Sequence, residues 1–280
     1  MASQLITFFR TLRSCFKLLL CLLCFLLYFI ISLMAVFVLS FIKPARRRRL
    51  NSRLIRLFDL CLVRIINIKV NVSNTHGPFS RNGLGVFLVS NHLSYVDGFV
   101  LGSAFPLIYM GKAEIRQWPL IGPMTELSGT LFIDKQKKNH IAEYIADVAS
   151  VLKGGANVLF FPEGTSTNGE TLLPFKSAFF EAPLMACAPI VPVAVIYKSV
   201  NGRPVTKENR DSVYWYGDMT FADHFFKLLF CDRVEAEIKV HSPLAKGDEG
   251  DKILARKHAS ELAYEAIRKD INLIGPASLT

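Results

Sequence analysis

The sequence predicts an α/β fold in which a mixed central sheet is flanked by helices, with an N-terminal transmembrane anchor. Two observations carry this prediction. From about residue 57 onwards, short runs rich in β-branched residues alternate with helical patterns, as in domains whose helices pack on a sheet. Before that point, Leu18–Ile42 is almost entirely apolar. We therefore divide the chain into an anchor with a basic segment, residues 1–56, and one domain, residues 57–280.

The apolar segment is long enough to cross a membrane. At about 1.5 Å rise per residue, a helix over Leu18–Ile42 can span a hydrocarbon core of about 30 Å with some tilt. A cleaved signal peptide would have a shorter apolar core, roughly 7–15 residues, followed by a small-residue cleavage site. Here Lys43, Pro44 and the arginine run 46–49 follow instead. We expect a retained single-pass anchor, and a bent hairpin that dips into one leaflet remains open.

Basic residues flank this segment on both sides, and the chain carries a net charge of +10. Such a charge favours an anionic partner, either nucleic acid or an anionic membrane surface. No nucleic-acid module is recognisable, and hydrophobic residues make up 51% of the chain, so we expect the membrane and no nucleic acid. The downstream cluster, which continues to Arg53 and Arg56, is denser than the upstream Arg10, Arg13 and Lys17. The positive-inside rule therefore places the domain on the cytoplasmic side.

The elements of the domain follow from hydrophobic periodicity. One face of His140–Leu152 carries apolar side chains at helical spacing, and Gly154 and Gly155 end that helix. Lys252–Ile271 predicts a closing amphipathic helix. The predicted strands are the β-branched runs Ile68–Val72, Gly85–Val89, Leu107–Gly111, Thr130–Ile133, Asn157–Phe161, Ile190–Tyr197 and Val234–Val240.

The first candidate site directly follows a strand that reads as buried. His92 and Asp97 lie five positions apart in the segment Asn91–Asp97. Open α/β sheets bind ligands at such strand ends, and a histidine can accept a proton near neutral pH. A nearby carboxylate can orient the ring and stabilise its charged form. Because no nucleophile elbow is present, the histidine could activate a hydroxyl of the substrate. The pattern alone is weakly specific and favours a structural histidine.

A second polar segment, Phe161–Gly169, follows another apolar strand. Glu163 could accept hydrogen bonds from a substrate hydroxyl or order the loop, and Gly164 allows a tight backbone. Thr165 and Ser166 are donors suited to a polar headgroup or a phosphate. A hydroxyl-rich turn between a strand and a helix is the alternative.

Two lysines mark a third candidate region between Gly111 and Lys135. Lys112 leaves one predicted strand, and Lys135 follows another one. Either cation could bind an anionic group of a ligand, or be a solvated surface side chain.

In this order, the segments resemble the glycerolipid acyltransferase family typified by 1-acylglycerol-3-phosphate acyltransferase. A single segment of this kind is weak evidence for the family, whereas several segments in this order and at this spacing are strong evidence. The resemblance covers about residues 86–195 of the domain. It rests on the segments Asn91–Asp97, Gly129–Lys135, Phe161–Thr165, Leu173–Lys176 with Phe179, and Pro189–Val193.

The resemblance implies both a fold and a reaction. The fold would be that of a glycerolipid acyltransferase, and the reaction would esterify the free hydroxyl of a membrane lysolipid acceptor. His92 would act as general base, and Asp97 would orient it. Glu163 and Gly164 would shape the acceptor site, and Gly129–Lys135 would help to hold its polar head. No metal or bound cofactor is implied; acyl-CoA or acyl carrier protein would serve as the acyl thioester co-substrate.

Two departures from the family pattern bear on the acceptor. Many lysophosphatidate enzymes carry arginine at the positions of Lys135 and Ser166. Arginine binds phosphate in a bidentate manner, whereas lysine acts as a point charge and serine as a neutral donor. Lysophosphatidate ranks first as acceptor, and another lysophospholipid or a lyso-ornithine lipid is an alternative. Val213–Met219 resembles bacterial members, including the lyso-ornithine lipid branch, so we expect a bacterial inner membrane.

Two other functions remain open from the sequence. A transacylase would move acyl chains between phospholipids without a thioester. A non-catalytic membrane scaffold would use the basic cluster and an inactive domain, and the intact pair of His92 and Asp97 argues against it.

Overall fold

A mixed eight-stranded sheet forms the centre of the computed structural model, which describes residues 2–74, 83–118, 121–134, 136–244 and 252–271. The strands are ordered β1-β8-β6-β2-β5-β3-β4, with the short β7 paired to β6. Neighbouring strands are parallel except at β6–β8 and β6–β7. The strands are β1 (Ile68–Asn74), β2 (Phe87–Ser90), β3 (Leu107–Lys112), β4 (Leu131–Ile133), β5 (Asn157–Phe160), β6 (Ile190–Val200), β7 (Arg203–Pro204) and β8 (Val234–Val240).

The mixed α/β fold predicted from the sequence is confirmed, and every strand expected from the sequence is present. The strand β2 starts at Phe87 instead of Gly85, where a Cβ atom would meet the backbone oxygen of Ala156 at 1.9 Å. The two-residue β7 was missed, because a strand that short leaves no periodic pattern.

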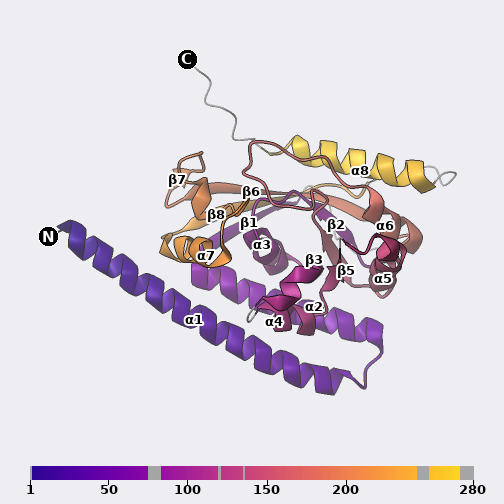
Figure 1. Cartoon of the computed structure of the whole chain (residues 1–280), viewed down its shortest axis with the longest axis horizontal. Coiled ribbons are helices and arrows are strands. Elements are labelled where there is room, and N and C mark those ends of the chain that lie inside the picture. The colour runs from indigo at the N-terminus through magenta and orange to yellow at the C-terminus, as the bar shows by residue number, and fades with distance from the viewer. Residues whose placement is uncertain (1, 75–82, 119–120, 135, 245–251, 272–280) are drawn as a thin grey trace, which may run out of the picture.

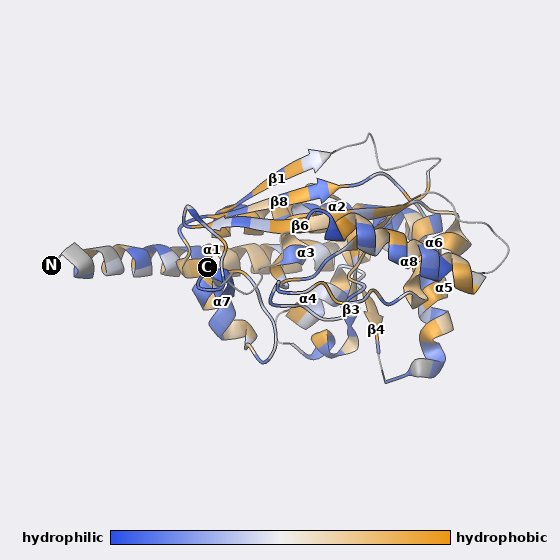
Figure 2. Ribbon diagram, turned by 90° about the horizontal axis from the view of Figure 1, so that it is seen from above, coloured by the Kyte–Doolittle hydropathy of each residue, from blue (hydrophilic) through white to orange (hydrophobic). Residues whose placement is uncertain are grey.

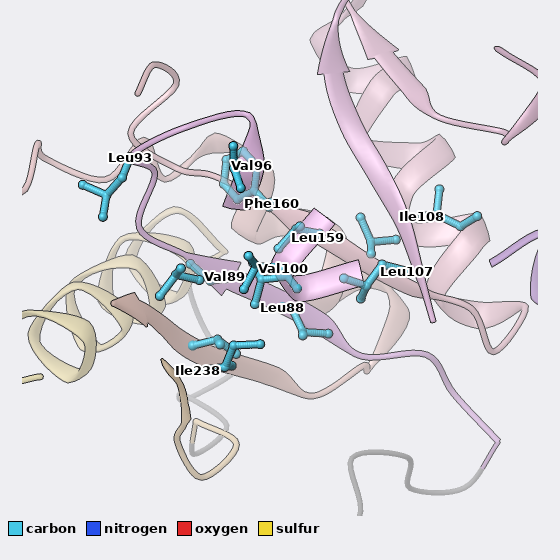
Figure 3. Close-up of a cluster of buried hydrophobic side chains, with 14 of the residues drawn as sticks. Leu88, Val89, Leu93, Val96, Val100, Leu107, Ile108, Leu159, Phe160 and Ile238 are labelled. Carbon is cyan, nitrogen blue, oxygen red and sulfur yellow. The ribbon is translucent and has the colours of Figure 1, made fainter. Parts of the chain in front are cut away.

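Helices cover both faces of the sheet. On one face α2 (Pro44–Ile66) contacts β1 and β3, and α3 (Val96–Ala104) packs on α2. On the other face lie α5 (Ile141–Lys153), α6 (Glu181–Ala186) and α8 (Lys252–Arg268), with α8 beside β6 (Figure 1). All four residues of β2 are buried, which explains why this strand is apolar throughout instead of alternating. Its Leu88 and Val89 belong to the core cluster that includes Val100 of α3 (Figure 3).

The N-terminal helix α1 (Ala2–Leu39) is one continuous helix, about 57 Å long at 1.5 Å per residue. It begins earlier than the predicted segment Leu18–Ile42, and it ends three residues before the end of that segment. Residues 7–38 are long and apolar enough to cross a membrane. The helix runs alongside α2, α4 (Ile121–Leu127) and α7 (Phe221–Phe230), and its first turns extend beyond the domain (Figures 1 and 2).

A buried lysine joins α1 to the ends of two other helices. The Nζ of Lys17 donates to the carbonyl oxygens of Ile66 and Cys231, each at 2.8 Å. These carbonyls lie at the C-terminal ends of α2 and α7, where cations stabilise the helix dipole. Arg13 likewise pairs with Asp232. Two of the upstream basic residues expected to flank a membrane segment therefore bind the domain.

The opposite faces of α1 are apolar and exposed. Phe25 and Tyr28 pack on Phe58 of α2, but most of the large apolar side chains of α1 are exposed. The large apolar side chains that it exposes include Leu5, Phe8, Phe9, Leu12, Phe16, Leu19, Leu22, Leu23, Leu26, Leu27, Ile30, Leu33, Met34, Phe37 and Val38. An apolar surface of this size indicates contact with a membrane or another apolar partner.

The helix α2 runs through the predicted boundary between residues 56 and 57. Ile55, on one side of this boundary, and Phe58 and Leu62, on the other, are all buried. The division of the chain into an anchor and a domain stays a prediction, and α2 is the element shared by both parts.

Candidate active site

The candidate residues gather at one edge of the sheet. The strands β2, β5, β3 and β4 are parallel neighbours, so their carboxyl ends meet at the same edge. The segment Asn91–Asp97 follows β2, Phe161–Gly169 follows β5, and Lys112 ends β3. The topology thus brings together segments that are about 70 residues apart in the sequence.

His92 and Asp97 form a hydrogen-bonded pair. The Nδ1 of His92 lies 3.0 Å from Oδ2 of Asp97, which is fully buried in the first turn of α3. Because a carboxylate only accepts hydrogen bonds, we assign the proton to Nδ1, which leaves Nε2 as an acceptor. The imidazole stacks on the ring of Phe161, with 4.0 Å between centroids, and its side chain remains 19% exposed. A histidine held in this way can take a proton from a ligand at Nε2.

Three further donors fix the carboxylate of Asp97. The backbone N–H groups of Leu93 and Ser94 donate to Oδ2 at 2.7 and 2.8 Å. The hydroxyl of Tyr197, from β6, donates to Oδ1 at 2.8 Å. Burial raises the pKa of Tyr197 well above its usual value, so the phenol stays a donor. With both oxygens engaged, the buried carboxylate is satisfied and its orientation is fixed.

Glu163 connects two loops through their backbones. Its Oε1 accepts the N–H of His92 at 2.7 Å, and its Oε2 accepts the N–H of Leu173 at 3.0 Å. The side chain is buried, and this burial raises the pKa of Glu163 to about 7 despite the two donors. Of the two roles open from the sequence, this geometry matches ordering of the loop.

Other contacts hold the same loop from the opposite side. The side-chain amide of Asn91 pairs with the backbone of Val195 on β6 in both directions, at 2.8 and 3.0 Å. The carbonyl of His92 accepts the N–H of Thr167 at 3.0 Å, and the carbonyl of Leu93 accepts that of Trp215 at 2.9 Å. These hydrogen bonds fix the backbone of the loop after β2. The partly exposed ring of His92 is the reactive group that the loop presents to a ligand.

The turn at Gly164 needs glycine. Its φ of 75° is a left-handed conformation, and a Cβ atom there would lie 2.6 Å from Nζ of Lys176. The structure thus brings a cation against the turn that carries the exposed Thr165 and the half-buried Ser166. Lys176 lies in a segment that resembles the family, but the sequence did not single out its charge.

The remaining predicted cations lie further along the edge. Lys112 is exposed at the end of β3, two strands from β2 and so about 10 Å across the sheet. Lys135 lies outside the described residues. A cavity of about 320 Å³ opens beside β4 and α5, with Arg116, Asp134, Lys137 and Asp147 among its lining residues. This cavity includes part of the Gly129–Lys135 segment.

Tyr197 is the site residue that sequence reasoning missed. It lies inside a strand that reads as a buried apolar run, and no local pattern marks it as a partner of Asp97. A tyrosine in such a run was the available signal, because a buried phenol needs a hydrogen-bond partner. Among the described residues, no three His, Cys, Asp or Glu side chains cluster in a way that could hold a metal ion.

Comparisons with known proteins place the chain among acyltransferases. The acyltransferase family model matches residues 69–196. A lyso-ornithine lipid O-acyltransferase of Pseudomonas aeruginosa is 34% identical over 192 residues, covering 69% of each chain. The same enzyme of Rhizobium meliloti is 27% identical over 212 residues, 73% of this chain and 70% of the other. A 1-acyl-sn-glycerol-3-phosphate acyltransferase of Neisseria gonorrhoeae is 36% identical over 126 residues, 45% and 49% of the two chains.

The fold itself has a counterpart among solved structures. The crystal structure of the 1-acyl-sn-glycerophosphate acyltransferase PlsC from Thermotoga maritima matches with a TM-score of 0.62 and 18% identity, covering 93% of this chain and 97% of the other. The matched family region contains the loop after β2 and the turn at Gly164. From its sequence relatives, this chain belongs to the acyltransferase family, as its motifs predicted.

Proposed function

We propose that this protein transfers an acyl group from a thioester to the free hydroxyl of a lysolipid, with His92 as general base. The observation that carries the proposal is the pair formed by His92 and the buried Asp97, with Nε2 of the ring left free at the open edge of the sheet. This is the arrangement that a hydroxyl acceptor requires, since a proton must leave as its oxygen attacks.

His92 and Asp97 together account for the proton transfers of the reaction. Nε2 of His92 takes the proton from the acceptor hydroxyl as its oxygen forms a bond to the thioester carbonyl carbon. The carbon–sulfur bond then breaks, and the thiolate leaves with the proton from the imidazolium. Asp97 keeps the proton on Nδ1 and stabilises the positive charge between the two steps. The products are the acylated lipid and a free thiol.

The other predicted site residues receive different roles in this proposal. Glu163 positions His92 through the backbone and does not bind the substrate directly. Gly164 permits the turn that presents Thr165 and Ser166, and these hydroxyls bind the polar head of the acceptor. Lys176 supplies the cation nearest to that turn, and Lys112 supplies a second one along the edge. Lys135 remains a further candidate.

For the acceptor, we propose a lyso-ornithine lipid first and lysophosphatidate second. The Pseudomonas relative, similar over 192 residues, is a lyso-ornithine lipid O-acyltransferase, and the Neisseria relative, similar over 126 residues, is a 1-acyl-sn-glycerol-3-phosphate acyltransferase. Ser166 and single lysines offer point charges and neutral donors instead of bidentate arginine, which suits an amino-acid headgroup. The sequence alone ranks these two acceptors in the opposite order.

We further propose acyl-CoA or acyl carrier protein as donor, and an anionic membrane as the surface on which the enzyme works. Arg46, Arg47 and Arg49 are exposed on the first turns of α2, where they can bind anionic headgroups. Their density supports the cytoplasmic side, and the bacterial relatives support a bacterial inner membrane.

The docked position of α1 bears on how it meets the membrane. Lys17 ties its first half to the domain, and its other end leads into α2. We therefore propose that α1 lies along one leaflet in the docked state; to span the bilayer, it would have to leave α2 and α7. Cys24 of α1 lies close to Cys61 of α2, so oxidation in vesicles should cross-link a docked helix, and a Cys24→Ser variant should not form this cross-link.

An acyl-transfer assay tests the proposed function. Purified protein receives one acyl-CoA and a panel of lyso-ornithine lipid, lysophosphatidate and other lysophospholipids, with His92→Ala as the matched variant. We expect ester formation that needs the thioester and falls about 10²–10⁴-fold in His92→Ala with the fold intact. Wild-type turnover by folded His92→Ala would overturn the proposal. Product formation without any thioester would indicate a transacylase. The absence of turnover on every acceptor would indicate a non-catalytic scaffold.

A further inference from the structure

The helix α7 exposes an apolar pair on its outer side. Thr220 caps its N-terminus, and Leu228 and Leu229 face the core. On the other side, Phe226 and Phe230 are 48% and 44% exposed. They lie four residues apart and thus on one face, with the exposed Lys227 beside them. A phenylalanine pair next to a cation is typical of helices that lie in a membrane interface.

The pair adjoins the exposed surface of α1. Arg13 donates to the carbonyl oxygen of Phe230 at 3.3 Å, and Ser14 donates to that of Leu229 at 3.3 Å. The exposed side chains of Phe9, Leu12 and Phe16 lie within one turn of these contacts on α1. The apolar surface of α1 therefore continues onto the end of α7.

The inner face of α7 reaches the loop that carries His92. Nδ1 of His224 lies 3.0 Å from the hydroxyl of Tyr95, which is three residues after His92. The ring of Tyr95 also packs on Phe221, at 4.9 Å between centroids. Burial lowers the pKa of His224 to about 4, so this histidine is neutral and packs as part of the interior. One short helix thus contacts the catalytic loop on one side and presents phenylalanines on the other.

We infer that Phe226 and Phe230 enter the hydrocarbon of the same leaflet as α1 and make α7 a second membrane contact of the enzyme. This inference rests on the proposed membrane function of α1. The occupant is lipid because the pair is continuous with the apolar surface of α1 and carries a basic residue suited to anionic headgroups. The helix then holds the leaflet surface beside the loop of His92, where an acceptor lipid must arrive.

Photo-crosslinking in the full-length protein tests this contact directly. The photoreactive analogue p-benzoylphenylalanine replaces Phe226 or Phe230 in protein reconstituted into vesicles of phosphatidylglycerol and phosphatidylcholine. The same analogue at Phe16 of α1 is the positive control. Leu262 is the negative control, because it is exposed on α8, across the sheet from α1 (Figure 1). We expect phospholipid adducts at Phe16, Phe226 and Phe230 but not at Leu262.

The controls separate the outcomes. Lipid adducts at Phe16 without any at Phe226 and Phe230 would overturn the inference and leave the role of α1 intact. Adducts to a second copy of the chain at the α7 positions would identify a dimer surface and would also overturn it. No adduct at Phe16 would contradict the proposed membrane contact of α1 itself.

A kinetic comparison adds a functional readout. The variant Phe226→Ser with Phe230→Ser is assayed on a vesicle-borne lysolipid and on a short-chain, water-soluble analogue. We expect the rate on the vesicle-borne lysolipid to fall roughly tenfold relative to the rate on the soluble analogue, because two phenyl groups no longer insert into the leaflet. An unchanged ratio would contradict a membrane role for the pair. His92→Ala loses both rates, so failure of the chemistry is distinguishable from failure of docking.

Discussion

The loop of His92 and the helix α1 are held in place by different forces. Directional hydrogen bonds hold the loop: Asp97 accepts four donors, and Glu163 accepts two backbone N–H groups. Around α1, apolar contact with Phe58 and a few polar bonds, chiefly those of Lys17, attach one face, while the other faces stay apolar and exposed.

This difference follows from what each region must do. Proton transfer needs a ring edge placed to within a fraction of an ångström, which directional bonds provide. Contact with lipid needs only apolar area, because the hydrophobic effect has no direction. Single substitutions should therefore damage the loop much more than the membrane-facing side of α1.

Asp97→Asn should cause the largest loss. The amide cannot accept both backbone donors and hold the Nδ1 proton of His92 as the carboxylate does, so the reactive tautomer is lost. We expect kcat to fall about 10²–10⁴-fold with little change in KM. Initial rates and circular dichroism on the same preparation test this, and turnover within tenfold of the wild type would contradict it.

Glu163→Gln should change how stability depends on pH. The folded state raises the pKa of Glu163 from 4.5 to about 7, so its contribution is fully present below pH 4.5 and is lost as pH rises through about 7. The loss corresponds to about 3 kcal/mol, or less where the loop relaxes. The wild-type Tm should fall across this window relative to the Tm of the variant. Parallel Tm curves of the two proteins would show that Glu163 does not titrate there.

Lys17→Met should loosen α1 without touching the loop. Two helix-end carbonyls lose their donor, which costs roughly 1.5–3 kcal/mol. We expect a lower Tm and less oxidative cross-linking between Cys24 and Cys61. Lys153→Met, at the exposed end of α5, is the control for loss of one positive charge. Equal behaviour of the two variants would mean that the buried contacts of Lys17 do not hold α1.

Tyr197→Phe should give the smallest of these effects. It removes one of the four donors to Asp97 and leaves the other three, so kcat should fall roughly tenfold while KM stays constant. Steady-state kinetics with a saturating acyl donor would measure this split. A change in KM alone would place Tyr197 in substrate binding instead.

The sequence predicted the strands and the paired loops but not the fate of the basic residues before the apolar segment. Periodicity located β8 because its alternation reflects local burial, whereas β6 was located as a β-branched apolar run that is buried on both faces. Arg13 and Lys17 read as membrane flanks, since hydropathy does not reveal which side of a helix meets protein. The helix α2 was missed as an element because its arginine-rich start resembles a juxtamembrane segment.

The motif residues and their order were thus determined by the sequence alone, since His92 and Asp97 lie within one turn of chain and form their pair locally. The tertiary structure decided their support. Glu163 is 71 residues from His92, and Tyr197 is 100 residues from Asp97, so only the packing of β5 and β6 against β2 brings them into contact. It also decided that α1 lies against the domain, because a buried lysine is favourable only where two helix ends offer their carbonyls.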